Sequence, residues 1–149
     1  MGFEKLKDIE HKVFSVKHEI FYPQLEEWRK SLKPNQEAKY KECVYILTTD
    51  RPVPRVIKED KKGILYIGKG LLTKNRERPG ALINAVNGTS SNQHGGGNLY
   101  LPLAESKKYP IESLKLTLYF IDNPRDLEAQ LLNEYHAVFG ELPPLNSLF

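Results

Sequence analysis

The chain has almost no cysteine and no long apolar segment. Cys43 is the only cysteine in 149 residues, which excludes an internal disulfide and a cysteine-rich metal site. No apolar run approaches the roughly 18 residues of a membrane-spanning helix. Residues 3–14 mix charged with apolar side chains, unlike a signal peptide. We therefore expect a compact cytoplasmic protein that has no membrane partner.

A nucleotide-binding loop is also missing, although Gly63–Lys69 has the glycine and lysine spacing of one. Such a loop needs serine or threonine after the lysine to reach a magnesium ion, but the next residue is Gly70. The intervening residues, Ile64–Ile67, favour pairing in a sheet. The sequence therefore predicts a strand, and the glycine, lysine and glycine at its end need another explanation.

Positive charge is concentrated in one segment. Residues 51–78 contain nine lysine and arginine residues against three acidic ones, whereas the whole chain has a net charge of only +3. A basic segment of this kind is typical of a surface that binds a polyanion such as nucleic acid. It is also typical of a solvated lysine-rich loop, and charge alone favours that interpretation.

The first part of the chain, residues 1–42, is predicted to form a helical arm and a linker. Apolar residues recur at intervals of three and four over residues 3–21, which predicts a helix with a narrow apolar seam. Pro23 suits the first position of a second, short helix, and residues 33–42 are polar enough to be a linker. The seam packs on the protein's own core, which we expect, or it pairs two chains in a homodimer.

Residues 43–149 are predicted to form one α+β domain. The order of elements predicts a small antiparallel three-stranded sheet flanked by helices. Period-two alternation and β-branched runs predict strands, and apolar periodicity with terminal proline or glycine predicts helices. The strands are expected at 43–48, 64–67 and 114–120, the helices at 79–88, 98–108 and 125–139, and a loop at 89–98.

The last predicted helix carries one carboxylate on its apolar face. At 100° per residue, Glu128 points into the arc of leucine and aromatic side chains, whereas Glu134 does not. An isolated buried charge is costly, so such a carboxylate is paired, protonated or bound to a metal ion. A salt bridge to a core arginine, a solvated position at the rim and a metal site all stay open on this evidence.

Five features, taken in order, resemble the GIY-YIG nuclease family. Residues 43–45 (Cys-Val-Tyr) and 66–68 (Tyr-Ile-Gly) resemble its two namesake motifs, each on a predicted strand. Arg76 follows the second motif at the family's usual distance. Glu128 resembles the family's metal-binding glutamate, and Asn146 in PPLN resembles its terminal asparagine. The resemblance covers nearly all of the predicted domain and implies a GIY-YIG-like fold for it.

The resemblance explains why the predicted strand at Leu65–Gly70 ends in glycine, lysine and glycine. In this family the strand delivers its tyrosine to the active site and turns at the glycine. Gly68 is therefore expected to permit a bulge or a close approach of the backbone. Lys69 resembles a lysine of some family branches, including the excision-repair nucleases.

The chain also departs from the family's pattern. Cys43 replaces the glycine of the first motif, and the connection between the two tyrosines is longer than in minimal members, which indicates an inserted basic loop. Many members carry a histidine four residues after the arginine, but glycine and leucine occupy that offset from Arg76 and Arg78. His94 either supplies this histidine or is a surface residue. Arg78 is an alternative to Arg76.

The resemblance implies a metal-dependent phosphodiesterase with one active site per chain. Glu128 would hold one Mg²⁺ or Mn²⁺ ion, a role that suits a lone carboxylate and several retained waters. Arg76, supported by Lys69, would stabilise the charge of the transition state. Tyr45 or Tyr66 would position or deprotonate the attacking water. Because a phenol has a pKa of about 10, deprotonation needs the metal ion and both cations nearby.

The implied partner is DNA, with RNA or branched DNA as alternatives. The cations expected to contact it are Lys69, Lys74, Arg76 and Arg78, and Asn146 is expected to support the site rather than to catalyse. Two other classes of function are kept as alternatives. One is a non-catalytic nucleic-acid-binding module that retains the fold, which the missing histidine favours. The other is an unrelated α+β interaction protein in which the motif match is chance.

Overall fold

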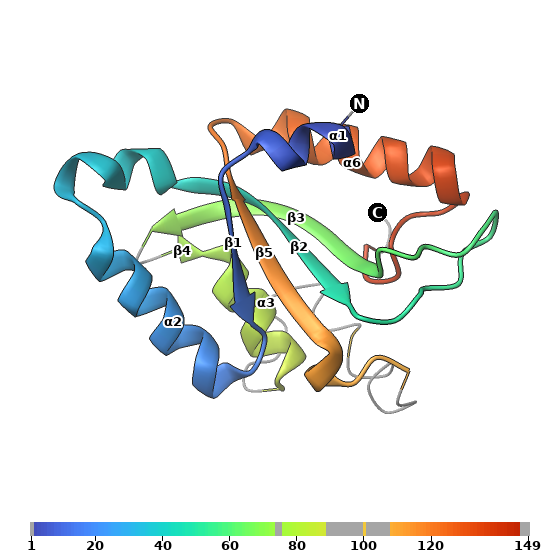
Figure 1. Ribbon diagram of the computed structural model, residues 1–149, viewed down its shortest axis with the longest axis horizontal. Coiled ribbons are helices and arrows are strands. Elements are labelled where there is room, and N and C mark those ends of the chain that lie inside the picture. Colours follow the sequence, from blue (N-terminus) through green and yellow to red (C-terminus); the bar gives the residue numbers. More distant parts are fainter. Residues whose placement is uncertain (1, 74–75, 89–99, 101–107, 147–149) are drawn as a thin grey trace.

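The computed structural model describes residues 2–73, 76–88, 100 and 108–146 of the 149-residue chain (Figure 1). The helices are α1 (Gly2–Lys5), α2 (His18–Ser31), α3 (Arg78–Val86) and α6 (Pro124–Phe139), with 3-10 helices η1 (Leu6–Asp8), η2 (Pro34–Tyr40) and η3 (Ile111–Ser113). The strands are β1 (His11–Ser15), β2 (Glu42–Thr49), β3 (Ile64–Thr73), β4 (Arg76–Glu77) and β5 (Leu114–Phe120).

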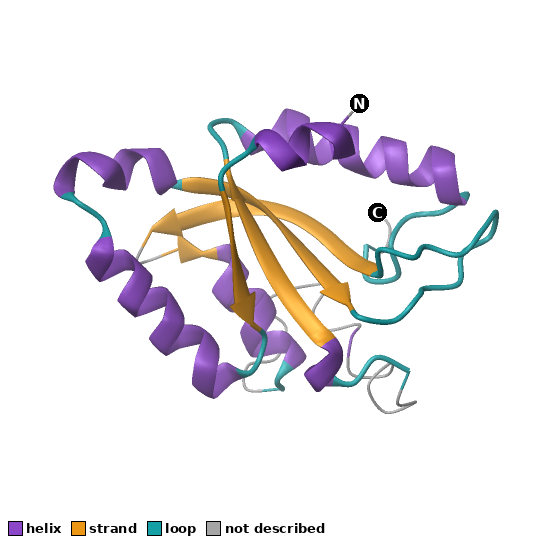
Figure 2. Cartoon of the chain, in the orientation of Figure 1, coloured by secondary structure: helices purple, strands orange, loops and turns teal. Residues whose placement is uncertain are grey.

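The strands form one sheet with the order β1-β5-β2-β3-β4, in which every pair is antiparallel. Helices α2 and α3 cover one face of the sheet, and α1 and α6 cover the other (Figure 2). The predicted α+β class is confirmed. The prediction of three strands is wrong, because β1 pairs beside β5 and the short β4 pairs with the end of β3.

The prediction of one helix over residues 3–21 is wrong for residues 11–15, which form strand β1. Only residues 2–8 are helical before β1 begins. Phe14 of β1 is 1% exposed, whereas its neighbour Val13, which belongs to the predicted helical seam, is 51% exposed. Two periodicities overlap in this segment, and pairing with β5 stabilises the period-two arrangement.

Helix α2 begins earlier than the sequence predicts. It starts at His18, and Pro23 lies inside it rather than at its first position. The predicted linker over residues 33–42 contains η2 and the start of β2. Leu6 and Val16 are both buried, so these residues of the predicted seam pack in the protein's own core.

The three predicted strands are confirmed, and β3 is longer than expected. It does not turn at Gly68 as the resemblance implied, because pairing with β2 continues beyond Gly70. The irregularity in register lies instead between Leu47 and Thr48 of β2. Because alternate residues of a strand share a face, β3 carries Tyr66, Gly68 and Gly70 on one side of the sheet.

The core lies in two layers, one on each face of the sheet. Along β2, Cys43 and Tyr45 face the layer beneath α2 and α3, whereas Val44 and Ile46 face the layer beneath α6. All four are at most 3% exposed, as expected for a central strand covered on both faces. The buried Cys43 thiol has a raised pKa because of burial, which leaves it unreactive.

The predicted ends of α3 and α6 are confirmed. Gly88 and Gly140 adopt φ values of +72° and +84°, the left-handed conformation in which glycine commonly ends a helix. The predicted loop 89–98 and nearly all of the predicted helix 98–108 lie outside the described residues. Of the helices that the structure describes, none combines the length and the apolar character needed to cross a membrane.

Candidate active site

Tyr45 and Tyr66 lie side by side on neighbouring strands. Tyr45 of β2 pairs with Gly68 of β3 and so shares a face with Tyr66. The ring centroids are 6.0 Å apart, and a side-chain hydrogen bond joins the two phenols. A Cβ atom at Gly68 would lie 2.6 Å from the Tyr66 ring and 2.7 Å from the Tyr45 ring. The space that Gly68 leaves is therefore taken by two tyrosine rings, and not by the bulge or close backbone approach that the sequence predicts.

Gly70 accommodates Arg78 in the same way. A Cβ atom at Gly70 would lie only 2.3 Å from Cβ of Arg78. Arg78 opens α3 directly after β4, which pairs with β3 just beyond Gly70. The two glycines that flank Lys69 therefore seat the two tyrosine rings and the arginine along one face of β3.

The positive charge of Arg78 affects both tyrosine hydroxyls. Its guanidinium lowers the pKa of Tyr45 and of Tyr66. The backbone of Arg76 lies in β4, but its side chain is outside the described residues, as are Lys74 and His94. The roles predicted for those three side chains stay predictions.

Glu128 and Lys69 approach the site from the other face of the sheet. Lys69 pairs with Val44, whose side chain belongs to the layer beneath α6. Burial raises the pKa of the half-buried Glu128, and the Lys69 ammonium lowers it. The Glu128 charge in turn raises the pKa of Tyr45 and Tyr66. Carboxylate, ammonium and phenols therefore interact around the edge of β3.

Asn146 covers the backbone edge of β3 at the centre of this group. β4 pairs only with the last two residues of β3, so β4 does not cover the edge beside Tyr66 and Gly68. There the Oδ1 atom of Asn146 accepts a hydrogen bond from the Ile67 amide at 2.9 Å, and its Nδ2 atom donates to the Ile67 carbonyl at 2.8 Å. This contact fits the supporting role that the sequence predicts for Asn146.

The two phenols differ in burial and therefore in pKa. Tyr45 is 1% exposed, and burial raises its pKa well above the ordinary value despite the Arg78 charge. Burial also raises the pKa of the less buried Tyr66, but Arg78 and the hydrogen bond from Tyr45 lower it. Tyr66 is therefore the phenol of the pair that ionises more readily, and Tyr45 donates the hydrogen bond between them.

Glu128 has the properties of a metal ligand, although it stands alone. In the part of the chain that the structure describes, its carboxylate forms no hydrogen bond or ion pair. A half-buried carboxylate whose pKa is lowered only by one exposed lysine favours a further cation beside it. No three His, Cys, Asp or Glu side chains among the described residues are grouped to hold a metal ion. The donor set therefore fits only an ion such as Mg²⁺ that retains most of its waters.

Two features of the site are not evident from the sequence predictions. The role of Gly70 could have been predicted from the sequence. Two glycines that are two residues apart on a strand leave room for two large groups on the same face of the sheet. The contact of Asn146 with Ile67 has no local signal, since no pattern in the sequence reveals which strand edge is uncovered.

No family model, no curated protein and no solved structure matches this chain. Interpretation of the site therefore rests on its own residues and their arrangement.

Proposed function

We propose that this chain is a metal-dependent endonuclease with a GIY-YIG type of active site, which hydrolyses phosphodiester bonds of DNA. One observation carries the proposal: Tyr45, Tyr66, Arg78 and Glu128 come from four elements and act on one another around one strand edge. Ionisable groups with shifted pKa values and mutual partners are typical of catalytic sites. A guanidinium and an unpaired carboxylate beside two phenols suit the binding and cleavage of a phosphodiester.

Tyr66 is assigned to the attacking water. The protonated Tyr45 donates a hydrogen bond to it, which lowers the pKa of Tyr66 and stabilises its phenolate. The Tyr66 phenolate then orients the water and accepts its proton as the water oxygen bonds to phosphorus. The bond from phosphorus to the leaving oxygen of the backbone breaks in the same step, and that oxygen takes a proton from solvent. Because burial raises the pKa of Tyr66, the cleavage rate is expected to increase toward alkaline pH.

Arg78 is assigned to the charge that develops on the phosphate. Cβ and Cγ of its side chain lie against Gly70. Donors that are fixed before the reaction stabilise a transition state without the cost of reorganisation. A guanidinium also matches the oxygens of a phosphate with two parallel hydrogen bonds. Arg76 is kept as a second candidate for this role.

Glu128 would hold the divalent ion, Mg²⁺ or Mn²⁺, which when bound supplies positive charge to the scissile phosphate. Lys69 lowers the pKa of Glu128 and so favours the ionised form that a metal ligand needs. Lys69 is also exposed, which places a cation where the nucleic-acid backbone would lie.

A nucleic-acid-binding module without catalysis is the second candidate. The raised pKa values of both phenols favour it, because neither is an efficient base near neutral pH. The lone carboxylate in the described part of the site favours it too. The two candidates differ in cleavage and not in binding.

The test separates binding from cleavage on end-labelled linear, branched and single-stranded DNA. Binding is measured in EDTA and cleavage in Mg²⁺, for the wild type and for Glu128→Gln. We expect the wild type to cleave, and the variant to bind as well but to cleave about 100- to 1000-fold more slowly. Asp126→Asn, an exposed carboxylate on the same helix, is the matched control. Binding of all three substrates without cleavage by the wild type would support the second candidate.

A further inference from the structure

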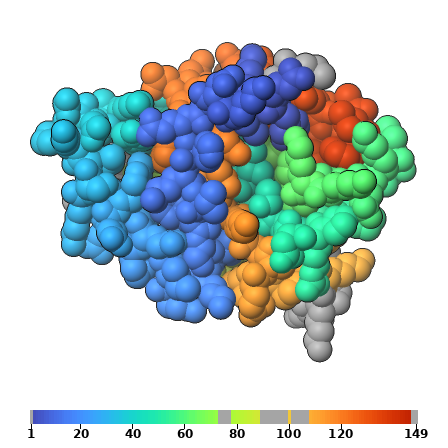
Figure 3. Space-filling view, viewed as in Figure 1, coloured from blue at the N-terminus to red at the C-terminus, as the bar shows by residue number. Residues whose placement is uncertain are grey.

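The connection between β2 and β3, residues 50–63, presents two apolar side chains at its tip. Val56 is 73% exposed and Ile57 is 62% exposed, the two highest values among the large apolar side chains that the structure describes. In the space-filling view this connection, coloured green, protrudes from one end of the molecule (Figure 3). Single exposed apolar residues are common, but an adjacent pair at a protruding tip calls for an explanation.

The backbone beneath this pair is held in place. The Ile57 amide donates to the carbonyl of Phe139 at 2.9 Å, and the Val56 amide donates to the Glu141 carboxylate at 2.8 Å. Arg55 forms an ion pair of 2.8 Å with the same carboxylate. The tip is therefore docked on the C-terminal end of α6, where Val56 and Ile57 lie against Gly140 and both remain mostly exposed.

The stem of the connection is fixed as well. Val53 and Asp60 exchange backbone hydrogen bonds of 2.9 and 2.8 Å. The Asp60 side chain, which is fully buried, accepts hydrogen bonds from the Tyr135 hydroxyl and the Ile64 amide, both at 2.9 Å. These contacts order the connection before any partner arrives, so little conformational entropy would be lost on binding.

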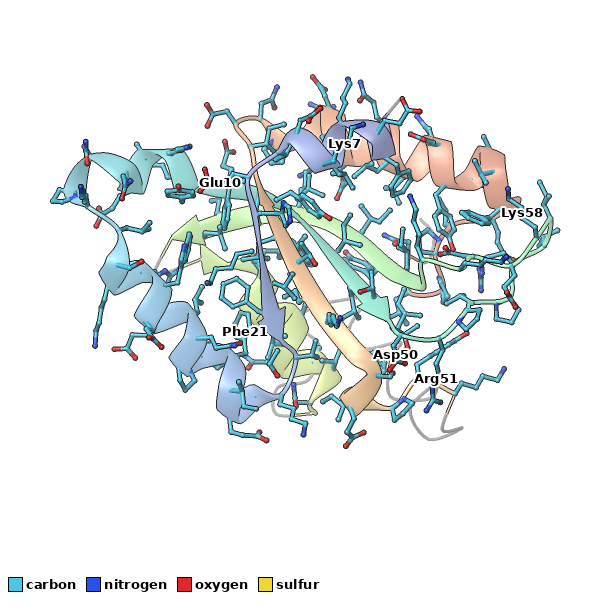
Figure 4. The ribbon with its side chains drawn as sticks, viewed as in Figure 1. Lys7, Glu10, Phe21, Asp50, Arg51 and Lys58 are labelled. Carbon is cyan, nitrogen blue, oxygen red and sulfur yellow. The ribbon has the colours of Figure 1, made fainter. Side chains whose placement is uncertain are left out.

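Positive charge lies along this connection, and two of its lysines, Lys58 and Lys62, sit over the rings of Phe139 and Phe3 at 5.9 and 5.2 Å. Lys58, Lys61 and Lys62 are exposed, and within the described ranges none of them forms an ion pair. Figure 4 shows Lys58 on the connection, close to the C-terminal end of α6. An apolar point with cations around it matches a partner that carries phosphates on its outside and flat apolar bases within.

We propose that Val56 and Ile57 form a wedge that enters between neighbouring bases of a nucleic acid, while the adjacent lysines hold its phosphates. This inference rests on the nucleic-acid binding of the proposed function. Aliphatic side chains that enter a base step unstack it, and contacts with the bent strand offset the cost of unstacking. A membrane is a poorer match, since the two side chains bury less hydrocarbon than a myristoyl chain, whose membrane binding is itself marginal.

The position of the wedge suggests what it selects. Phe139, on which the tip is docked, follows Glu128 by three turns of α6, which is roughly 16 Å at about 1.5 Å per residue. Successive phosphates of one strand rise about 3.4 Å along the axis of a duplex, so on a duplex that runs along α6 the wedge would act roughly five base pairs from the cut. The favoured substrates are those with a weakly stacked step at that distance, such as a mismatch or a branch point.

The test uses 2-aminopurine, a base whose fluorescence increases when it is unstacked, placed at a mismatch in a DNA duplex. Wild-type protein is titrated in EDTA, so the signal does not depend on cleavage. We expect a several-fold increase in fluorescence. The double variant Val56→Ser/Ile57→Ser should bind DNA with an unchanged salt dependence, but it should lose most of the increase in fluorescence.

The double variant Lys58→Gln/Lys61→Gln tests the phosphate contacts. It should lower the slope of log affinity against log salt concentration by about two.

Two control variants complete the test. Val13→Ser/Ile20→Ser removes exposed apolar side chains elsewhere, and Lys7→Gln/Lys115→Gln removes exposed charges elsewhere. Neither should change the signal. Binding without a fluorescence increase would overturn the wedge, as would an equal increase with Val56→Ser/Ile57→Ser, or a requirement of these residues only for binding to anionic vesicles. A normal increase in a protein that never cleaves DNA would overturn the nuclease proposal and leave the wedge standing.

Discussion

The carboxamide of Asn146 pairs with the backbone of Ile67 as a neighbouring strand would. It accepts from the Ile67 amide at 2.9 Å and donates to the Ile67 carbonyl at 2.8 Å. Ile67 lies between Tyr66 and Gly68, so this contact fixes the backbone that positions the phenol pair. An asparagine suits the role because its amide carries a donor and an acceptor side by side.

Replacing Asn146 with aspartate should therefore be destabilising. A carboxylate can accept from the Ile67 amide, but it turns an oxygen toward the Ile67 carbonyl and leaves that acceptor unpaired. We expect a loss of about 1–3 kcal/mol in the free energy of unfolding, measured by denaturant titration. Asn133→Asp, at an exposed position of α6, is the control. Equal stability of the two variants would show that the contact with Ile67 is not important.

Gly70→Ala should displace Arg78. The new methyl group would overlap Cβ of Arg78, which lies 2.3 Å from the Cβ position, and relief of such overpacking typically costs about 1–3 kcal/mol. We expect the variant to be less stable and to lose cleavage as Arg78→Ala does. The double variant Gly70→Ala/Arg78→Gly removes the overlapping atoms and should recover stability but not activity. Failure of the double variant to recover stability would place the strain elsewhere.

Glu128→Gln should stabilise the protein near neutral pH. Burial raises the pKa of Glu128 in the folded state, so the carboxyl favours folding when protonated, below its unfolded pKa. This contribution is lost as the pH rises through the folded pKa. The neutral glutamine avoids the cost of the buried charge, so the melting temperature in EDTA should increase at about pH 7. The increase should shrink below about pH 4, and Asp126→Asn should show none. A destabilised Glu128→Gln at neutral pH would indicate a structural ion pair instead.

Stability should fall in alkaline solution because several phenols are buried. The pKa of Tyr45 is raised well above its ordinary value by burial, and that of Tyr100 is raised to about 12. The unfolded chain loses these protons first, so stability is complete below about pH 10 and is lost as the pH rises through the folded pKa values. Tyr45→Phe removes one such group and should reduce the alkaline slope of the unfolding free energy. An unchanged slope would mean that Tyr45 titrates normally in the folded protein.

Local patterns predicted the elements that are regular over many residues. The alternation in β5 and the apolar face of α6 identified both elements, because each repeats its signal over several turns or pairs. The same method failed for β1, where Val13 and Phe14 belong to different periodicities. Only pairing with β5, which lies far away in the sequence, selects between them.

The sequence names candidate residues for the site, but it does not give their arrangement. Tyr45 and Tyr66 are placed together by the register of β2 against β3, which adjacent strands suggest. The interaction of Glu128 with both phenols depends on how α6 packs across the opposite face. That packing comes from tertiary contacts, which no spacing in the sequence reports.

The central claim is that the groups around the edge of β3 cut a phosphodiester. The most direct measurement is the rate at which a supercoiled plasmid is nicked in Mg²⁺ by wild-type protein, by Arg78→Ala and by Arg125→Ala, whose arginine is exposed at the start of α6. The account predicts nicking by the wild type and by Arg125→Ala, and a rate about 100- to 1000-fold lower for Arg78→Ala. Equal rates for the wild type and Arg78→Ala, in folded preparations of both, would contradict it.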